Sequence, residues 1–349
     1  MAAFVPRALA TGIGSLPHPD ASSALRVILK NFPCIPYWPQ LTRRDFRENM
    51  YVQFSEGLAG VKLDIAREYI GVEIGQESMG QAEAFYARYL EEDPGLFAIG
   101  RDYARGLFAL AEEGVALDSL QWIKGQVTGP ISFGLRVTDQ NLRPVLYDET
   151  LRDVLVKHLV RKAQWEESYL SGIGSTLIFV DEPSLALIGA SMVALNRDEV
   201  VRDLEEVLGG LKGLKGTHCC GNTDWSLLLQ TSVDVISFDA YNYAENLALF
   251  TGDVKAFLDR GGVIAWGIVP TAEDEIMRTS EEELVKRLDS AMGLLVNKGL
   301  DRGLVYQQAL ITPACGLGTI SVPAAERALM LTHKVSRRVR DREWAFQSE

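Results

Sequence analysis

The sequence predicts an α/β fold, a single (β/α)8 barrel of the TIM type over residues 1–349. Two observations lead to this prediction. About eight short apolar runs lie along the chain, and segments with helical spacing separate many of them. Strands that alternate with helices form a parallel sheet, and about eight such units favour a closed barrel over an open sheet.

The candidate strands share an apolar body that ends in small or polar residues. They cover residues 8–15, 34–38, 122–128, 176–181, 213–219, 233–239, 262–267 and 309–313. The run at 34–38 is the weakest candidate because it contains proline, which cannot donate a backbone hydrogen bond.

Four segments carry apolar residues at helical spacing or helix-start signals, namely 151–170, 197–208, 280–297 and 323–337. Ser280 is followed by three glutamates, which is typical of a helix cap, and Pro323 suits a first helical turn. Residues 42–119 have mostly helical patterns and lie between the second and third strand candidates. We expect them to form a helical insertion after the second strand. No linker rich in Pro, Gly or Ser divides the chain, which indicates one domain.

The composition excludes several classes of function. Hydrophobic residues make up 47%, charged residues 23%, and the formal net charge is −12. The basic residues form no binding patch, which argues against a nucleic-acid partner. No run of about eighteen apolar residues predicts a membrane span, and the first residues lack the pattern of a signal peptide. We therefore expect a cytoplasmic protein without a membrane partner.

The cysteines favour a metal site over a disulfide framework, because Cys219 and Cys220 are adjacent. His218, Cys220 and the distant Cys315 offer the nitrogen and sulfur ligands that Zn²⁺ takes in proteins. Residues two apart on a strand point the same way, so His218 and Cys220 share a side and Cys219 faces the opposite one. The alternative is a set of inert core cysteines beside a hydrogen-bonded histidine.

Catalytic groups of such barrels project from the C-terminal ends of the strands. Asp181, Cys220, Asp239 and Cys315 lie at or just after the ends of candidate strands, so we expect them to converge on one rim. Asp239 is the candidate fourth metal ligand, and the alternative is that it caps the next helix.

A zinc ion with two thiolate ligands suits alkyl transfer to sulfur. The thiolates offset most of the ion's charge, so it can hold a substrate thiol as a thiolate, which is the nucleophile. Activation of water is the competing use of such an ion.

Short motifs along the chain carry a family resemblance. They are Ile13-Gly14-Ser15, Thr128-Gly129-Pro130, Asp181-Glu182-Pro183, His218-x-Cys220 and Cys315-Gly316-Leu317. With them the chain resembles the C-terminal catalytic barrel of cobalamin-independent methionine synthase, in the superfamily of uroporphyrinogen decarboxylase and corrinoid methyltransferases. The resemblance implies that His218, Cys220 and Cys315 are the catalytic zinc ligands. Asp239 falls where the family usually has a glutamate ligand.

The resemblance also implies a site for homocysteine. The segment Ile13, Gly14, Ser15 would hold its amino-acid end, and Asp181 would bind its amino group. Glu56 is a second candidate partner for that amino group, and the alternative is a glutamate on a surface helix.

Three departures from the family bear on the methyl donor. The length leaves no room for the second, N-terminal barrel that helps the family bind folate. The aromatic folate platform corresponds to residues 131–134, which contain no Trp, and the family's proton-shuttling His is replaced near residues 269–271. These departures favour methylcobalamin or a methylated corrinoid protein as the donor.

The sequence therefore predicts a zinc-dependent methyltransferase that converts homocysteine to methionine. One alternative is a thiol methyltransferase with an acceptor like coenzyme M, and another is a metal-free enzyme like uroporphyrinogen decarboxylase. A third is a non-catalytic protein that shields a corrinoid protein. The methyl donor, the partner protein and the oligomeric state stay open at this point.

Overall fold

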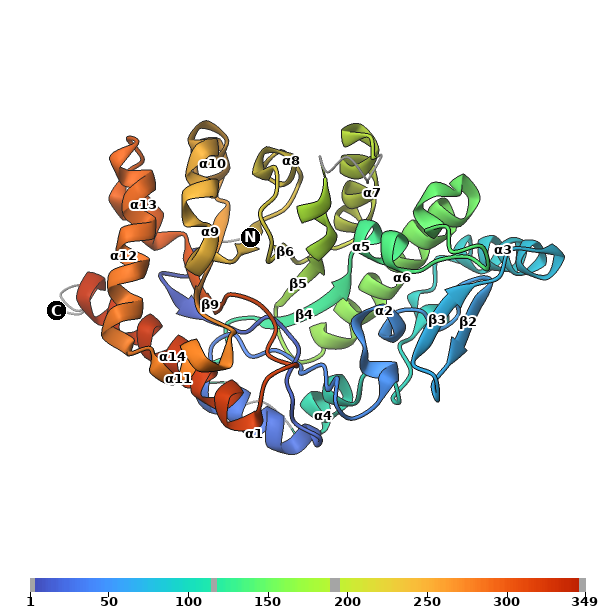
Figure 1. Ribbon diagram of the computed structural model, residues 1–349, viewed down its shortest axis with the longest axis horizontal. Helices are drawn as coiled ribbons and strands as arrows, with labels where there is room; N and C mark the ends of the chain where they lie inside the picture. The colour runs from blue at the N-terminus through green and yellow to red at the C-terminus, as the bar shows by residue number, and fades with distance from the viewer. Residues whose placement is uncertain (1–3, 114–117, 189–194, 345–349) are drawn as a thin grey trace.

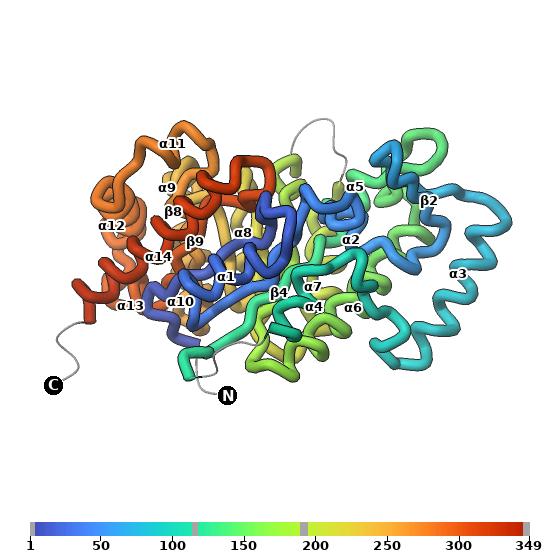
Figure 2. Tube along the Cα trace, turned by 90° about the horizontal axis from the view of Figure 1, so that it is seen from below, coloured from blue at the N-terminus to red at the C-terminus, as the bar shows by residue number. Residues whose placement is uncertain are grey.

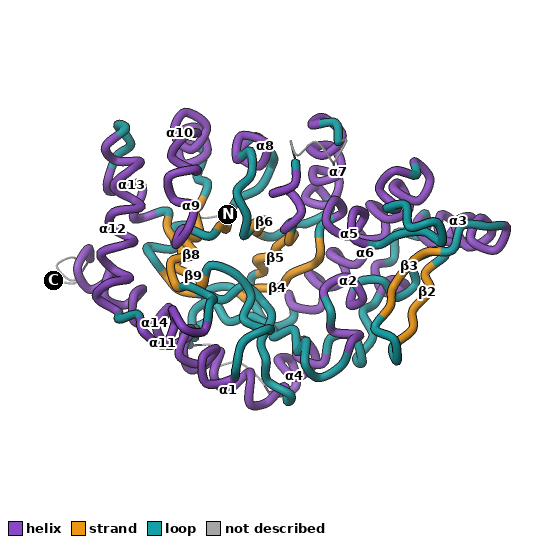
Figure 3. Tube along the Cα trace, viewed as in Figure 1, coloured by secondary structure: helices purple, strands orange, loops and turns teal. Residues whose placement is uncertain are grey.

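The computed structural model describes residues 4–113, 118–188 and 195–344. Its centre is a sheet of seven parallel strands in the order β1-β9-β8-β7-β6-β5-β4 (Figures 1 and 3). The strands are β1 (Leu9–Ala10), β4 (Ile123–Thr128), β5 (Thr176–Asp181), β6 (Leu214–Cys219), β7 (Val235–Phe238), β8 (Val263–Val269) and β9 (Ala309–Pro313). The α/β class predicted from the sequence is confirmed.

The closed eight-stranded barrel predicted from the sequence is wrong. The sheet is an open half-barrel whose edges are β1 and β4. The expected strand at 34–38 does not form. Its segment meets β4 through an isolated bridge of Tyr37 with Lys124 and a hydrogen bond from the Lys124 N–H to the Pro36 carbonyl at 2.8 Å. Pro36 and Pro39 interrupt this segment, and proline has no N–H group for a continuous ladder.

The first strand is also shorter than the predicted run at 8–15. Arg7 and Ala8 have φ angles of 49° and 58°, which lie outside the extended region. The strand therefore begins only at Leu9, and its pairing with β9 covers two residues of each strand.

Helices cover the outside of the sheet. They are α1 (Ala21–Asn31), α4 (Arg105–Glu113), α5 (Pro130–Arg136), α6 (Glu149–Ser171), α7 (Arg197–Gly209), α8 (Trp225–Leu229), α9 (Ala240–Leu247), α10 (Thr251–Asp259), α11 (Glu273–Arg278), α12 (Glu281–Asn297), α13 (Arg302–Gln307) and α14 (Val322–Trp344). Each of the four expected helices lies within one of these or starts at its cap. The capping box is present, because Ser280 accepts from the Glu283 N–H and Glu283 accepts from the Ser280 N–H.

The insertion at 42–119 is only partly helical in its described residues. It contains η1 (Phe46–Glu48), α2 (Met50–Gln53), α3 (Gln76–Tyr89), η2 (Pro94–Phe97) and α4. It also contains an antiparallel hairpin of β2 (Val61–Asp64) and β3 (Tyr69–Val72), which the helical pattern did not predict. Figure 2 shows the hairpin and α3 at one side of the half-barrel. No helix in the described ranges could cross a membrane by length and apolar character.

Two apolar clusters flank the sheet. The larger cluster lies between the sheet and the helices. The smaller cluster fills the concave interior and contains Leu177 and Phe179 of β5. Asp181 follows on the same face, because residues two apart on a strand point the same way. The interior is thus apolar at the middle of β5 and polar at its C-terminal end.

Candidate active site

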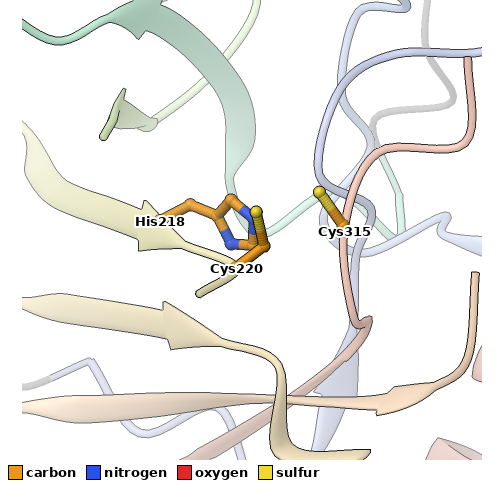
Figure 4. Close-up of side chains that lie close together, drawn as sticks. All are labelled: His218, Cys220 and Cys315. Atoms are coloured by element: carbon orange, nitrogen blue, oxygen red, sulfur yellow. The ribbon is translucent and has the colours of Figure 1, made fainter. Parts of the chain in front are cut away.

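Three potential metal ligands meet at the C-terminal ends of the strands. His218 lies in β6, Cys220 follows that strand, and Cys315 follows β9 (Figure 4). One ligand atom of each residue lies within 4.8 Å of the other two. Two strands, β7 and β8, separate β6 from β9 in the sheet, so the curvature of the half-barrel brings the three side chains together.

The ring of His218 is held by a residue of the next strand. Its Nδ1 lies 2.9 Å from the Ser237 hydroxyl, and the two residues are register partners in β6 and β7. Its Nε2 is buried and has no hydrogen-bond partner among the described residues. Because the Nδ1 contact fixes the ring, Nε2 is the nitrogen that is free to bind a metal.

The thiols of Cys220 and Cys315 shift each other's pKa. The nearby Cys315 thiol and, after it, the His218 ring lower the pKa of the Cys220 thiol to about 4. The same contact with Cys220 raises the pKa of Cys315 well above its usual value. The opposite shifts belong to one coupled pair, which loses its first proton easily and its second with difficulty. The surroundings thus favour loss of the proton from Cys220 over loss from Cys315.

Cys219 lies outside this group. Its side chain is fully buried in the cluster between sheet and helices. Burial raises the pKa of its thiol to about 12. A buried thiol of this kind is unreactive, and its side chain faces away from the rim.

Asp239, the sequence candidate for a fourth ligand, occupies a helix cap. One carboxylate oxygen accepts from the Asn242 N–H at 2.9 Å and the other from Asn242 Nδ2 at 2.7 Å. These bonds cap α9. Burial raises the pKa of Asp239, although the bonds from Asn242 oppose the shift. Asp239 thus caps α9, and its oxygens keep lone pairs beyond those that Asn242 uses.

Asp181 ends β5 beside His218, its register partner in β6. Its Oδ1 is buried and has no hydrogen-bond partner among the described residues. Burial raises the pKa of Asp181 to about 6, and the nearby Lys124 opposes this shift. A buried carboxylate oxygen without a donor is costly, so this position suits a cationic ligand group.

The neighbouring Glu182 caps the start of α5. Its carboxylate accepts from the N–H groups of Ile131 and Ser132 at 2.9 and 2.7 Å, at the start of α5. An added Cβ at Gly129 would overlap this carboxylate. The Thr-Gly-Pro and Asp-Glu-Pro motifs are therefore in contact, because Glu182 of the second packs against Gly129 of the first.

The segment 13–15 lies against the loop that carries Cys315. The Ser15 hydroxyl accepts from Gly318 N–H at 3.2 Å, and the Ser15 carbonyl accepts from Leu317 N–H at 2.9 Å. An added Cβ at Gly14 would lie 2.6 Å from Gln40 Oε1, so the segment is closely packed against Gln40. It therefore helps to set the position of the Cys315 loop.

Glu56 is occupied elsewhere. Its carboxylate accepts from the Gly100 N–H at 2.6 Å, and its charge acts on Lys162 of α6. It is not part of the His-Cys-Cys group.

Sequence reasoning did not single out Ser237, Lys124 or Gln126, which also lie in or under this rim. Each is a polar residue inside a strand that was expected to be buried, and that signal was available. Tyr51 of α2 was missed as well. Burial raises the pKa of its hydroxyl, and the charges of Glu182 and Cys220 also raise it.

One cavity lies away from this rim. It has a volume of about 1380 Å³ and is lined by residues at the start of β5 and β6, including Thr176 and Leu214. Its polar groups already serve the fold, since Glu167 accepts from the N–H groups of Lys212 and Gly213. We therefore place the candidate site at the opposite end of the strands, where parallel barrels carry their chemistry.

Two solved structures resemble the chain over nearly its whole length. The first is a B12-independent methionine synthase from Shewanella sp. W3-18-1 in complex with selenomethionine, with 18% identity, a TM-score of 0.60, and coverage of 97% of this chain and 99% of that chain. The second, from Listeria monocytogenes, is provisionally described as a vitamin-B12 independent methionine synthase, with 13% identity, a TM-score of 0.56, and coverage of 93% and 86%. At these identities the likeness shows a shared fold. No protein-family model and no curated protein matches the chain.

Proposed function

We propose that the chain is a zinc-dependent methyltransferase that transfers a methyl group to the thiol of homocysteine and so forms methionine. The observation that carries the proposal is the meeting of one imidazole and two cysteine side chains within 4.8 Å at the rim. The shared fold with proteins named as methionine synthases supports the same reaction class.

The residues present fit a zinc ion. His218 Nε2 is buried and unpartnered among the described residues, and Cys220 is poised as a thiolate. A set of one nitrogen and two sulfur atoms is typical of catalytic zinc sites that keep one position for a substrate. His218, Cys220 and Cys315 would hold the ion. Asp239 remains the candidate fourth ligand, because each of its oxygens accepts one bond from Asn242 and keeps a second lone pair.

A bound zinc ion would act as a Lewis acid that lowers the pKa of the acceptor thiol toward neutrality. The chain's own residues would orient the acceptor. Asp181 would accept hydrogen bonds from its ammonium group, and the backbone of residues 13–15 would bind its carboxylate. The deprotonated sulfur then attacks the methyl carbon. The S–C bond forms while the bond between the donor and the methyl carbon breaks, and that electron pair stays with the donor.

The corrinoid donor expected from the sequence lacks support. The Shewanella structure is named B12-independent and aligns with 97% of this chain, so a unit of this size does not by itself point to a corrinoid. The test must therefore offer more than one donor.

The adjacent cysteines provide a matched pair of variants. The zinc-loaded wild type is given homocysteine with methyltetrahydrofolate and, separately, with methylcobalamin, and methionine is measured. Cys220→Ser should lose bound zinc and methionine formation, whereas Cys219→Ser should keep both. Full zinc content and full activity in Cys220→Ser would falsify the proposal.

A further inference from the structure

A lysine is buried in the concave interior of the half-barrel, under the candidate site. Lys124 projects from β4 and is only 1% exposed. Its ammonium lies 4.6 Å from the ring centroid of Phe179 and 5.8 Å from that of Tyr37. Two aromatic faces thus surround a charge that has been withdrawn from water.

The hydrogen bonds of this ammonium lead to the rim. Lys124 Nζ donates to the carbonyl oxygen of Ile13 at 2.5 Å and to Gln126 Oε1 at 3.1 Å. Both acceptors are neutral. An ammonium has three N–H groups, and these are its two acceptors among the described residues. The third N–H group remains for a partner that the described chain does not supply.

Few negative charges near Lys124 balance its positive charge. Burial lowers the pKa of Lys124 to about 8, while Asp181 and Glu166 oppose that shift. Glu166 is itself fully buried, and burial raises its pKa to about 8, so it is mostly neutral at pH 7. Asp181 is then the main anion near Lys124. In the proposed reaction, however, Asp181 binds the ammonium group of the acceptor.

An amino-acid acceptor completes this charge balance. Its ammonium group pairs with Asp181, and its carboxylate lies at residues 13–15, whose Ile13 carbonyl is held by Lys124. Two opposite charges on the protein thus match two opposite charges on one ligand. Pairing of this kind is the condition under which a buried ammonium is tolerated.

We propose that Lys124 determines the specificity of the site for an acceptor with a carboxylate, because it fixes the Ile13–Ser15 segment and places a positive charge beneath it. This inference rests on the proposed function. Lys124 is a positioning residue and takes no part in the transfer of the methyl group. The site should therefore prefer thiols that carry both an amine and a carboxylate over thiols that carry an amine alone.

The test compares two acceptors on the zinc-loaded protein, homocysteine and the aminopropanethiol that lacks its carboxylate. Lys124→Met removes the charge at similar length. It should raise KM for homocysteine by about ten- to a hundredfold, the usual effect of losing a charge-assisted contact. Its kcat for homocysteine and its KM for the aminopropanethiol should change little.

Lys162→Met is the matched control. Lys162 is also 1% exposed and also donates to a backbone carbonyl, that of Ala98, but it lies on the outer helix α6. It should leave the preference between the two acceptors unchanged. If Lys124→Met does not fold, Lys124→Gln serves as the uncharged variant.

The outcomes separate the two claims. An active wild type that uses both acceptors equally, or an active Lys124→Met with the wild-type preference, overturns this inference alone. A wild type that forms no methionine with either donor overturns the proposed function and the inference with it. A Lys124→Met whose KM rises equally for both acceptors assigns the residue a structural role only.

Discussion

Glu166 Oε1 accepts hydrogen bonds from the indole N–H of Trp38 at 2.8 Å and from the backbone N–H of Gln126 at 2.9 Å. Glu166 belongs to the outer helix α6, whereas Gln126 lies in β4, at the open edge of the sheet. The carboxyl group thus satisfies a strand N–H where no eighth strand is present. An added Cβ at Gly125 would overlap it, so this close approach depends on glycine.

We expect Glu166→Ala to lower the free energy of unfolding by about 2–4 kcal/mol, because it leaves two buried donors unpaired. Glu166→Gln keeps an acceptor oxygen at the same position. Because burial holds the native carboxyl mostly neutral at pH 7, this second variant should cost less than about 1 kcal/mol. Urea unfolding at pH 7 measures both values. Equal losses of unfolding free energy in the two variants would show that the acceptor oxygen of Glu166 does not stabilise the edge of the sheet.

Continuous apolar runs made most of the sheet predictable. The runs at 176–181 and 309–313 became β5 and β9 with the same bounds. The run at 34–38 is equally apolar, but proline has no N–H group to donate to a neighbouring strand, so no continuous ladder forms. The hairpin of β2 and β3 could not be predicted because its strands are short and partly exposed. Its turn also carries no glycine signal, since Glu68 takes the positive φ of 50°.

The rim could be predicted because parallel strands end at one edge of a sheet. That rule brought His218, Cys220 and Cys315 into one group without knowledge of any distance. It could not tell whether Asp239 faces a metal or caps a helix, since both roles need a carboxylate at a strand end. The contacts of Lys124 join residues 111 positions apart, so no local pattern contains them.

Ser237→Ala should weaken zinc binding by about ten- to a hundredfold. The reason is that the hydroxyl lies 2.9 Å from His218 Nδ1 and fixes the ring that presents Nε2. Competition with a chromophoric chelator measures the zinc affinity. Ser237→Thr keeps the hydroxyl and serves as the control. An alanine variant that holds zinc as tightly as the wild type would show that the ring needs no such support.

If the rim holds zinc as proposed, removal of the ion should make Cys220 available to a thiol reagent. The neighbouring Cys315 and His218 lower the pKa of the Cys220 thiol to about 4, which favours a reactive thiolate, whereas burial raises the pKa of Cys219 to about 12. Iodoacetamide should thus label Cys220 after treatment with a chelator and spare it in the zinc-loaded protein. Peptide mass spectrometry locates the label. Labelling of Cys220 at the same rate with and without zinc would rule out its role as a ligand.

Gly129→Ala should destabilise the fold by about 1–3 kcal/mol, since a Cβ at this position overlaps the carboxylate of Glu182. The displaced carboxylate would also release the N–H groups at the start of α5. Gly80→Ala is the matched control, because Gly80 lies inside α3 with open space around its Cβ position. That control should gain about 0.5–1 kcal/mol from helix propensity. A loss of the same size in both variants would point to a general effect of alanine.

His158 should make the fold less stable as the pH falls. The side chain is fully buried in α6, with Nε2 2.8 Å from the Phe54 carbonyl. Burial lowers its pKa to about 3, and the charge of Lys162 adds to the shift. The unfolded chain takes up this proton near pH 6.5, whereas the native state remains neutral until about pH 3. The unfolded state thus binds more protons between these limits, and this contribution to stability declines from pH 6.5 downward.

His158→Gln isolates that contribution, because glutamine can still donate to the Phe54 carbonyl but does not titrate. The variant should be less stable than the wild type at pH 7.5. Well below pH 6.5 the difference should shrink by up to about 1.4 kcal/mol per pH unit, which is the slope for one proton. Urea unfolding of both proteins at pH 7.5, 6.0 and 5.0 gives the difference directly, and carboxylates that titrate in both proteins cancel. A constant difference over this range would mean that the native histidine takes up its proton as readily as the unfolded one.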